Sequence, residues 1–157
     1  MKKKTLTLLF LRRENEILLA MKKQGFGAGR WNGVGGKLEE GESIEQALIR
    51  ESQEEIGVTP IDHYKVADIR FDEYMKGERI LMHVHVYVAT TWSGEPTESD
   101  EMTPKWFTVD SVPYPKMWPD DPYWLPLIIK GKKVSADFQL NEEDAIISHN
   151  VTVVEKL

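Results

Sequence analysis

The chain has 157 residues, a formal net charge of −6 and no cysteine. This length suits one domain with a substantial core, so we expect residues 1–157 to fold as a single domain. The negative charge argues against binding to a nucleic-acid polymer, and the absence of cysteine excludes disulfides and thiol catalysis. No segment approaches the ~20 apolar residues of a membrane helix, so we expect no membrane partner. We expect a cytoplasmic location and a monomer.

The N-terminal part predicts two strands followed by a loop. The opening run MKKKTLTLLFLRR has a short apolar stretch that ends in two arginines without a small-residue cleavage site. It therefore reads as a strand at 5–11 rather than as a signal peptide. A second strand is expected at 17–21, and the glycine-rich stretch 22–32 is expected to be a basic loop.

A helix is predicted between Ser43 and Gly57. Ser43 and Gln46 have the spacing of a capping box, Gly57 is a helix stop, and Pro60 lies just beyond it. Apolar residues recur at helical spacing, which favours packing of one helix face on a sheet. These residues are Ile44, Ala47, Leu48 and Ile56.

The second half of the chain predicts five strands and one further helix. The strands are expected at 66–74, 81–91, 105–108, 134–140 and 145–153. The helix is expected at 122–130, with Asp121 as its N-cap, Gly131 after its end, and Pro126 inside it as a source of distortion. Strands and helices in this order predict an α/β (α+β) protein with a mixed central sheet between two helices, an α/β/α sandwich.

The first helix carries an unusual concentration of acids on one face. Glu51, Glu54 and Glu55 lie at positions i, i+3 and i+4, so they share one turn of surface. This crowding is unfavourable unless a hard divalent cation such as Mg²⁺ or Mn²⁺ lies among the carboxylates. The alternative is a solvated acidic face. The glycine-rich entry at 33–37 and the neighbouring Arg50 favour the cation site.

The segment from Gly36 to Val58 resembles the Nudix box, GX5EX7REUXEEXGU, in which U is a bulky apolar residue. One position departs from the pattern, because Ser52 stands where an apolar residue is expected. The matching positions are Gly36, Glu42, Arg50, Glu51, Glu54, Glu55 and Gly57, with apolar Ile56 and Val58 beside the last glycine. The resemblance implies a Nudix-type fold and cleavage of a nucleoside diphosphate linked to another group.

The same resemblance implies a division of roles around the metal. Mg²⁺, for which Mn²⁺ can substitute, is held by the carbonyl of Gly36 and by glutamates that are also the catalytic residues. Glu101 is implied as an additional carboxylate, either a ligand or a general base, with a purely structural role as the alternative. The implied glutamates are Glu51, Glu54, Glu55 and Glu101. Lys37 adds charge for the phosphates, whereas Glu42 and Arg50 support the loop–helix geometry.

Three further stretches, at 21–33, 98–102 and 117–124, resemble the branch of the Nudix superfamily that hydrolyses oxidised purine nucleoside triphosphates. This resemblance implies contacts of Trp118, Asn32, Asp120 and Asp121 with the oxidised base. Thr7 and Lys22 are implied near the nucleoside, and Phe26 and Met102 as closing the pocket. Taken singly, the aromatic residues could be core and the aspartates a helix start.

The two adjacent aspartates should repel each other in a partly dry pocket, so at least one should have a raised pKa. One proton could then be relocated to read either oxidised guanine or oxidised adenine. Because Asp121 is expected to cap a helix, we expect Asp120 to be the more adaptable member. His83 and His85 alternate on one strand and are interpreted as an exposed sheet face rather than a metal site.

The expected reaction is hydrolysis of oxidised purine (deoxy)nucleoside triphosphates, such as 8-oxo-dGTP and 2-oxo-dATP, to the monophosphate and pyrophosphate, which would sanitise the nucleotide pool. The expected partner is a small-molecule nucleotide. One alternative is a Nudix hydrolase of a methylated purine nucleotide, ADP-ribose or a dinucleoside polyphosphate. The other is a non-catalytic nucleotide sensor, against which the complete carboxylate set argues.

Overall fold

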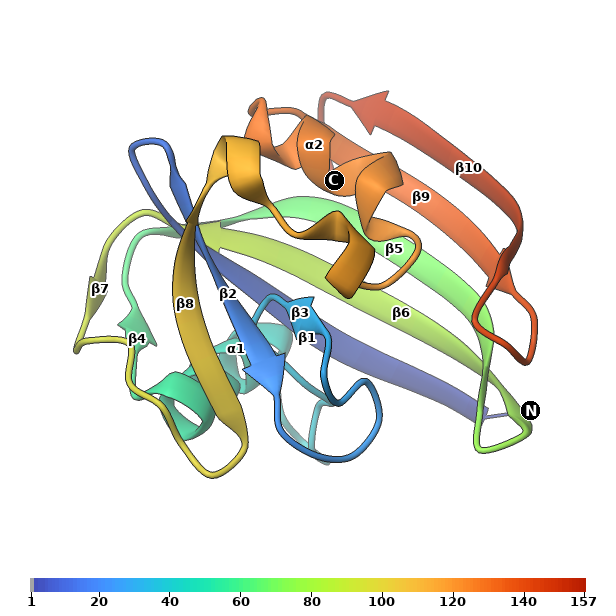
Figure 1. Cartoon of the computed structure of the whole chain (residues 1–157), viewed down its shortest axis with the longest axis horizontal. Coiled ribbons are helices and arrows are strands. Elements are labelled where there is room, and N and C mark those ends of the chain that lie inside the picture. The colour runs from blue at the N-terminus through green and yellow to red at the C-terminus, as the bar shows by residue number, and fades with distance from the viewer. Residues whose placement is uncertain (1) are drawn as a thin grey trace.

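The computed structural model describes residues 2–157 and contains one large mixed sheet with a helix on each face (Figure 1). The helices are α1 (Ile44–Ile56) and α2 (Asp121–Ile129). The long strands are β1 (Lys2–Arg13), β2 (Glu16–Lys22), β5 (His63–Met75), β6 (Glu78–Ala89), β8 (Met102–Thr108), β9 (Lys133–Leu140) and β10 (Ile146–Val154). The two-residue strands are β3 (Trp31–Asn32), β4 (Thr59–Pro60) and β7 (Trp92–Ser93).

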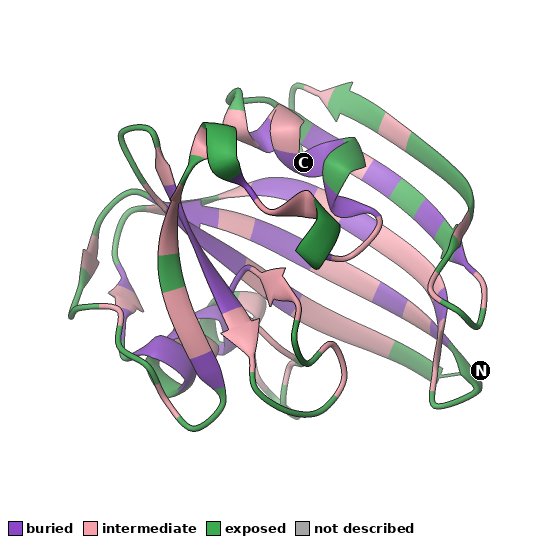
Figure 2. Ribbon diagram, in the orientation of Figure 1, coloured by how far each residue is buried: buried purple, intermediate pink, exposed green. Residues whose placement is uncertain are grey.

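The main sheet has the strand order β10-β9-β5-β6-β1-β2-β3, and β8 also pairs with β2. The pairs β1–β6 and β5–β9 are parallel and the remaining pairs are antiparallel, so the sheet is mixed. The central strands are buried or partly buried over most of their length, whereas β10 at the edge is largely exposed (Figure 2). This arrangement confirms the predicted mixed sheet and its α/β class.

The two faces of the sheet are covered by different helices because successive side chains of a strand point to opposite faces. Leu9 and Leu11 of β1 pack with Leu48 and Ile56 of α1. Phe10, between them in sequence, packs in the other cluster with residues of α2. The α/β/α sandwich therefore follows from the alternation of apolar residues along β1.

Local interactions define the ends of α1. The Ser43 side chain accepts a hydrogen bond from the Gln46 backbone N–H at 3.1 Å, and the Gln46 side chain accepts one from the Ser43 N–H at 2.9 Å. Gly57 ends the helix in the left-handed region, with a φ of 71°. The departure at Ser52 has a cost, because this side chain is fully buried and its hydroxyl has no hydrogen-bond partner within residues 2–157.

The site arises where β1 and β2 separate. These strands pair only at the hairpin, through Arg12–Ile17 and Arg13–Glu16. Beyond that point the segment 33–37 takes the place beside β1, with bridges from Leu9 to Val34 and from Leu6 to Lys37. The divergence opens a space between the β2 side and the β5–β6 side of the fold.

Several sequence-based boundaries were wrong in detail. The three two-residue strands were not predicted, and β3 lies inside the stretch interpreted as loop. Helix α2 begins at Asp121 rather than Pro122, its N-cap residue is Asp120, and no side chain caps it. Among residues 2–157, no helix is long and apolar enough to cross a membrane.

Candidate functional site

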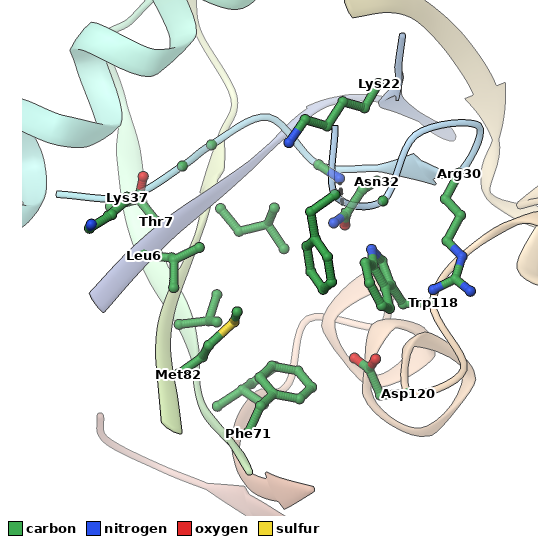
Figure 3. Close-up of a pocket in the computed structure, with 18 of the residues that line it drawn as sticks. Leu6, Thr7, Lys22, Arg30, Asn32, Lys37, Phe71, Met82, Trp118 and Asp120 are labelled. Atoms are coloured by element: carbon green, nitrogen blue, oxygen red, sulfur yellow. Dashed lines mark hydrogen bonds between the residues drawn. The ribbon is translucent and has the colours of Figure 1, made fainter. Parts of the chain in front are cut away.

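A cavity of about 320 Å³ lies in the space between the diverging strands. Its floor is the face of β5 and β6 that includes Phe71 and Met82 (Figure 3). Ten of the residues predicted as site residues line this one cavity, although they come from distant parts of the chain. They are Thr7, Lys22, Phe26, Asn32, Gly36, Glu55, Met102, Trp118, Asp120 and Asp121.

One end of the cavity is aromatic. The rings of Phe26 and Trp118 are tilted, with centroids 4.9 Å apart, and the Arg30 guanidinium lies 4.1 Å from the Trp118 ring centroid. Close approach is possible because Gly27 has no side chain; a Cβ there would lie 3.0 Å from Trp118 Cζ2. Trp118, Arg30 and Asp120 gather on one side of the cavity, away from Lys37 (Figure 3). The indole therefore offers a flat surface for a planar base.

Asp120 and Asp121 supply carboxyl groups beside this aromatic end. Burial raises the pKa of both, and for Asp121 the charge of Asp120 adds to the effect of burial. Asp120 accepts a hydrogen bond from the Trp124 indole N–H at 2.8 Å. Asp121 Oδ2 is buried and has no hydrogen-bond partner in residues 2–157.

These contacts differ from the capping role that was expected for Asp121. Asp121 was predicted to cap α2, but its carboxyl makes no capping hydrogen bond. Asp120 was expected to be the adaptable member, but one of its oxygens is occupied by Trp124. The reason is that α2 starts one residue earlier than predicted, which makes Asp121 part of its first turn. Asp121 therefore keeps one oxygen, Oδ2, without a partner in residues 2–157, whereas Asp120 Oδ2 is bound by Trp124.

Asn32, Lys22, Thr7 and Met102 complete this part of the lining. The Asn32 side-chain oxygen accepts the Gly33 backbone N–H at 2.8 Å, which leaves the amide NH₂ as a donor for a ligand. Thr7 is buried, and its hydroxyl has no partner within the described chain. Met102 pairs with Lys22 where β8 meets the end of β2, so strand register brings two distant parts of the sequence to one edge.

The other end of the cavity meets the acidic face of α1. Burial, together with the charges of Glu51 and Glu101, raises the pKa of Glu55 to about 8. Glu55 accepts the Gly35 backbone N–H at 2.9 Å. The pKa of Glu51 is also raised by burial, against the opposing effect of its hydrogen bond with Arg50. The fold thus holds the carboxyl groups of Glu51 and Glu55 close together in a partly buried environment.

Arg50 organises the acids around it. It donates to Glu42 at 2.7 and 2.9 Å and to Glu51 at 2.9 Å, and it lies 3.4 Å from the more exposed Glu54. The hydrogen bond from Arg50 lowers the pKa of Glu42 to about 2. Arg50 also donates to the carbonyl of Lys37 at 3.1 Å, which ties the helix to the preceding loop. These contacts agree with the supporting roles expected for Glu42 and Arg50.

Gly36 and Glu101 lie at the same acidic end. A Cβ on Gly36 would be 2.6 Å from Glu51 Oε1, so the backbone passes directly beside this carboxylate. The charge of Glu101 acts on both Glu51 and Glu55, although Glu101 comes from a loop far away in the sequence. The structure therefore groups Glu51, Glu55 and Glu101 electrostatically, with Glu54 at the rim.

A separate cluster of possible metal ligands lies on the opposite face of the sheet. The ligand atoms of Asp68, His83 and His85 lie within 4.8 Å of one another. The Lys65 ammonium already lies between two of them, 2.9 Å from Asp68 Oδ2 and 2.8 Å from His85 Nδ1. Arg70 donates to the other Asp68 oxygen at 2.7 Å. This cluster is therefore a charge network in which protein cations already occupy the carboxylate.

The interpretation of these histidines as an exposed sheet face was wrong, because His83 is only partly exposed and His85 is buried. Their rings share one face, with centroids 4.2 Å apart. His85 is buried, however, and burial followed by the charge of Lys65 lowers its pKa to about 4. The covering comes from the neighbouring strands, which alternation along a single strand does not reveal.

Sequence reasoning missed several residues that line the cavity. Phe71 and Glu73 of β5, Met82 of β6, and Arg30 of the glycine-rich loop are the clearest examples. The alternation of Ile69, Phe71 and Glu73 on one face was visible in the sequence, but the identity of that face as a cavity floor was not.

Comparisons with known proteins agree with this geometry. The NUDIX domain family matches residues 1–128. The chain is 46% identical over 154 residues to the oxidized purine nucleoside triphosphate hydrolase of Danio rerio, across 98% of this chain and 97% of that protein. It is 44% identical over 149 residues to the protein of the same name in Mus musculus, across 95% and 94% of the two chains.

A solved structure supports the fold independently. The crystal structure of the MutT protein from Bacillus halodurans superposes with a TM-score of 0.82, across 94% of this chain and 97% of that chain, at 22% identity. The family match covers residues 1–128, and two relatives match over nearly the whole chain, so these comparisons include both the central sheet and the acidic helix α1. The chain belongs to the Nudix family and is a Nudix hydrolase.

Proposed function

We propose that the protein hydrolyses oxidised purine (deoxy)nucleoside triphosphates, such as 8-oxo-dGTP and 2-oxo-dATP, to the monophosphate and pyrophosphate. The observation that carries this proposal is one cavity that joins an aromatic, carboxyl-lined end to Glu55 on the acidic face of α1. Two relatives that are named oxidized purine nucleoside triphosphate hydrolases, and that match nearly end to end, support the same substrate class.

The base end offers both stacking and adaptable hydrogen bonds. Trp118 stacks on the purine, and Asn32 and Asp121 face its edges. A carboxylate accepts hydrogen bonds, whereas the protonated acid also donates one. Burial raises the pKa of both Asp120 and Asp121, which favours retention of a proton by the pair. Relocation of that proton lets the same pocket read oxidised guanine or oxidised adenine.

The residues at the acidic end fit a divalent cation. Glu51 and Glu55 are buried close to each other, and the charge of Glu101 acts on both. A divalent cation can take the place of the protons on these carboxyl groups and compensate their negative charges. Mg²⁺, or Mn²⁺ in its place, would be held by Glu51, Glu54, Glu55, Glu101 and the Gly36 carbonyl. When bound, such an ion neutralises phosphate oxygens and makes a water more acidic.

The chain's own groups set up the reaction around that ion. Arg50 orients Glu51, and the Gly35 N–H orients Glu55, so both carboxylates are fixed before substrate binds. Lys22 and Lys37 line the cavity and supply positive charge toward the phosphates. Glu101 acts as a further ligand or as the base that takes the proton of the attacking water.

A substrate panel tests the proposal. Initial rates for 8-oxo-dGTP, 2-oxo-dATP, O6-methyl-dGTP, dGTP and ADP-ribose would be measured with and without Mg²⁺. We expect kcat/KM for the two oxidised purines to exceed that for dGTP by ~10-fold or more. This ratio corresponds to the free energy of one hydrogen bond to a charged group. Preference for ADP-ribose or the methylated nucleotide would support a different Nudix activity. Absence of turnover with every substrate would support the sensor.

Metal should also stabilise the fold, and more so at about pH 8.5 than at about pH 6. Glu55 has a pKa of about 8 in the metal-free fold, against 4.5 for a free glutamate. Protonation of Glu55 contributes fully to the free energy of unfolding below pH 4.5, and this contribution is lost as the pH rises through about 8. A cation replaces that proton, and at a concentration a hundred times its Kd it is expected to raise the free energy of unfolding by ~2.7 kcal/mol. Thermal unfolding with and without Mg²⁺ measures this; an unmoved melting temperature at both pH values would contradict the site.

A further inference from the structure

The base end of the cavity contains a third carboxyl group, that of Glu73, which has no role in the reaction as described. Glu73 lies on β5 in the same row as Ile69, Phe71 and Met75, all of which line the cavity. Its side chain is only 5% exposed. A carboxyl in an otherwise apolar row is costly to bury, so its presence calls for a partner.

The protein itself does not supply that partner. Within residues 2–157, no hydrogen bond or ion pair satisfies the Glu73 carboxyl. The cation that acts on it, Arg30, makes no ion pair with it: one Arg30 nitrogen lies 3.6 Å from Asp144, the guanidinium lies over the Trp118 ring, and Nη1 has no hydrogen-bond partner in residues 2–157. Burial, followed by the charges of Asp120 and Asp144, raises the pKa of Glu73 to about 7. Because Glu73 lines the cavity and has no protein partner there, its carboxyl group is available to a bound ligand.

The charges that act on Glu73 also locate it along the cavity. They belong to Asp120, Asp144 and Arg30, whereas the charges that act on Glu55 belong to Glu51, Glu101 and Lys22. Glu73 thus lies at the base end, away from the acidic face of α1. A nucleotide with its phosphates at that acidic face has its sugar between the two ends. The edge of the base opposite the sugar, the Watson–Crick edge, then reaches the Glu73 end.

We propose that Glu73 is a specificity-determining residue that accepts a hydrogen bond from an N–H group on the Watson–Crick edge of the bound purine. The inference rests on the proposed function, because it needs a purine in this cavity. The chemical class that it selects is purines with an amino group on that edge, such as the N2 amine of guanine, over purines without one. A hypoxanthine base lacks the amine and would leave the buried carboxyl with one donor fewer.

The test compares two substrates that differ only in this amine, 8-oxo-dGTP and 8-oxo-dITP. We expect the wild-type protein to favour 8-oxo-dGTP, and Glu73→Leu to reduce that preference by ~10-fold, with Glu73→Gln intermediate because its amide oxygen still accepts. Because Glu73→Leu removes an unpaired buried carboxyl, we also expect its melting temperature without nucleotide to be equal to or higher than that of wild type.

Asp72→Asn is the matched control. Asp72 precedes Glu73 on β5 but points to the other face, where it pairs with Arg79 at 2.6 and 2.8 Å. This variant removes the same charge from the same strand and should keep the wild-type preference. An equal loss of kcat/KM for both substrates in Glu73→Leu would mean a structural role and would overturn the inference.

Two failures can be told apart. If wild type prefers 8-oxo-dGTP over dGTP, but Glu73→Leu keeps the wild-type ratio of 8-oxo-dGTP to 8-oxo-dITP, only the inference about Glu73 is wrong. If wild type shows no preference for 8-oxo-dGTP over dGTP, the proposed function fails and the inference about Glu73 fails with it.

Discussion

Glu55→Gln is expected to lower kcat by ~10²-fold or more, or about 2.7 kcal/mol of transition-state stabilisation, while the protein stays folded. Glu55 is buried at the point where the cavity meets α1, and it is held by the Gly35 N–H at 2.9 Å. Glutamine keeps the size of the side chain and an oxygen that can accept this hydrogen bond. It removes the negative charge that a divalent cation needs, and it relieves repulsion with Glu51 and Glu101.

The measurement is pyrophosphate release under saturating substrate and Mg²⁺, together with thermal unfolding of the metal-free protein. Glu45→Gln is the matched control, because Glu45 lies on the same helix but is exposed and lies in its first turn. We expect the control to keep wild-type kcat. A folded Glu55→Gln protein with near-normal kcat would show that Glu55 is not a required ligand.

Alanine at the two neighbouring glycines should separate folding from activity. A Cβ on Gly35 would lie 1.9 Å from the Thr7 carbonyl oxygen, so Gly35→Ala forces two backbone segments apart. We expect Gly35→Ala to lower the free energy of unfolding by about 3 kcal/mol or more. A Cβ on Gly36 would instead meet the Glu51 carboxylate at 2.6 to 2.9 Å. That carboxylate is the end of a flexible side chain and can move.

Gly36→Ala is therefore expected to remain folded but to lose ~10²-fold or more in kcat, because it displaces a predicted metal ligand from its place beside Arg50. Each variant serves as the control for the other. Circular dichroism melting curves and Mg²⁺-dependent turnover distinguish them. Gly36→Ala with unchanged turnover, or Gly35→Ala with unchanged stability, would contradict the close backbone approach on which the site depends.

The sequence determined those parts of the protein that depend on interactions within a few residues. Helix α1 was predicted with its ends because the Ser43–Gln46 capping box and the Gly57 stop act locally. The spacing of Glu51, Glu54 and Glu55 required a shared helix face. Alternating apolar residues predicted the long strands, although their ends differ by a few residues because pairing with neighbours extends them.

The resemblance of three further stretches to the branch of the Nudix superfamily that hydrolyses oxidised purine nucleoside triphosphates extended this local information to distant residues. It led to Trp118 and Asp120 as well as Glu101, which no periodicity would connect with α1. The structure brings Trp118 and Asp120 into one cavity with Glu55 and the acidic end, and it brings Glu101 into electrostatic contact with that end. Their roles in binding and catalysis stay predictions.

Tertiary structure alone decided what the cavity contains and how its groups are paired. The separation of β1 from β2 turned one face of β5 into a cavity floor, and so placed Glu73 among the base-facing residues. Helix α2 starts one residue earlier than predicted. Asp120 accepts a hydrogen bond from Trp124, whereas Asp121 Oδ2 has no partner within residues 2–157. Neighbouring strands buried His85 beside Lys65. Each outcome depends on which distant segment covers a side chain, and burial by a distant segment leaves no mark in the local pattern of residues.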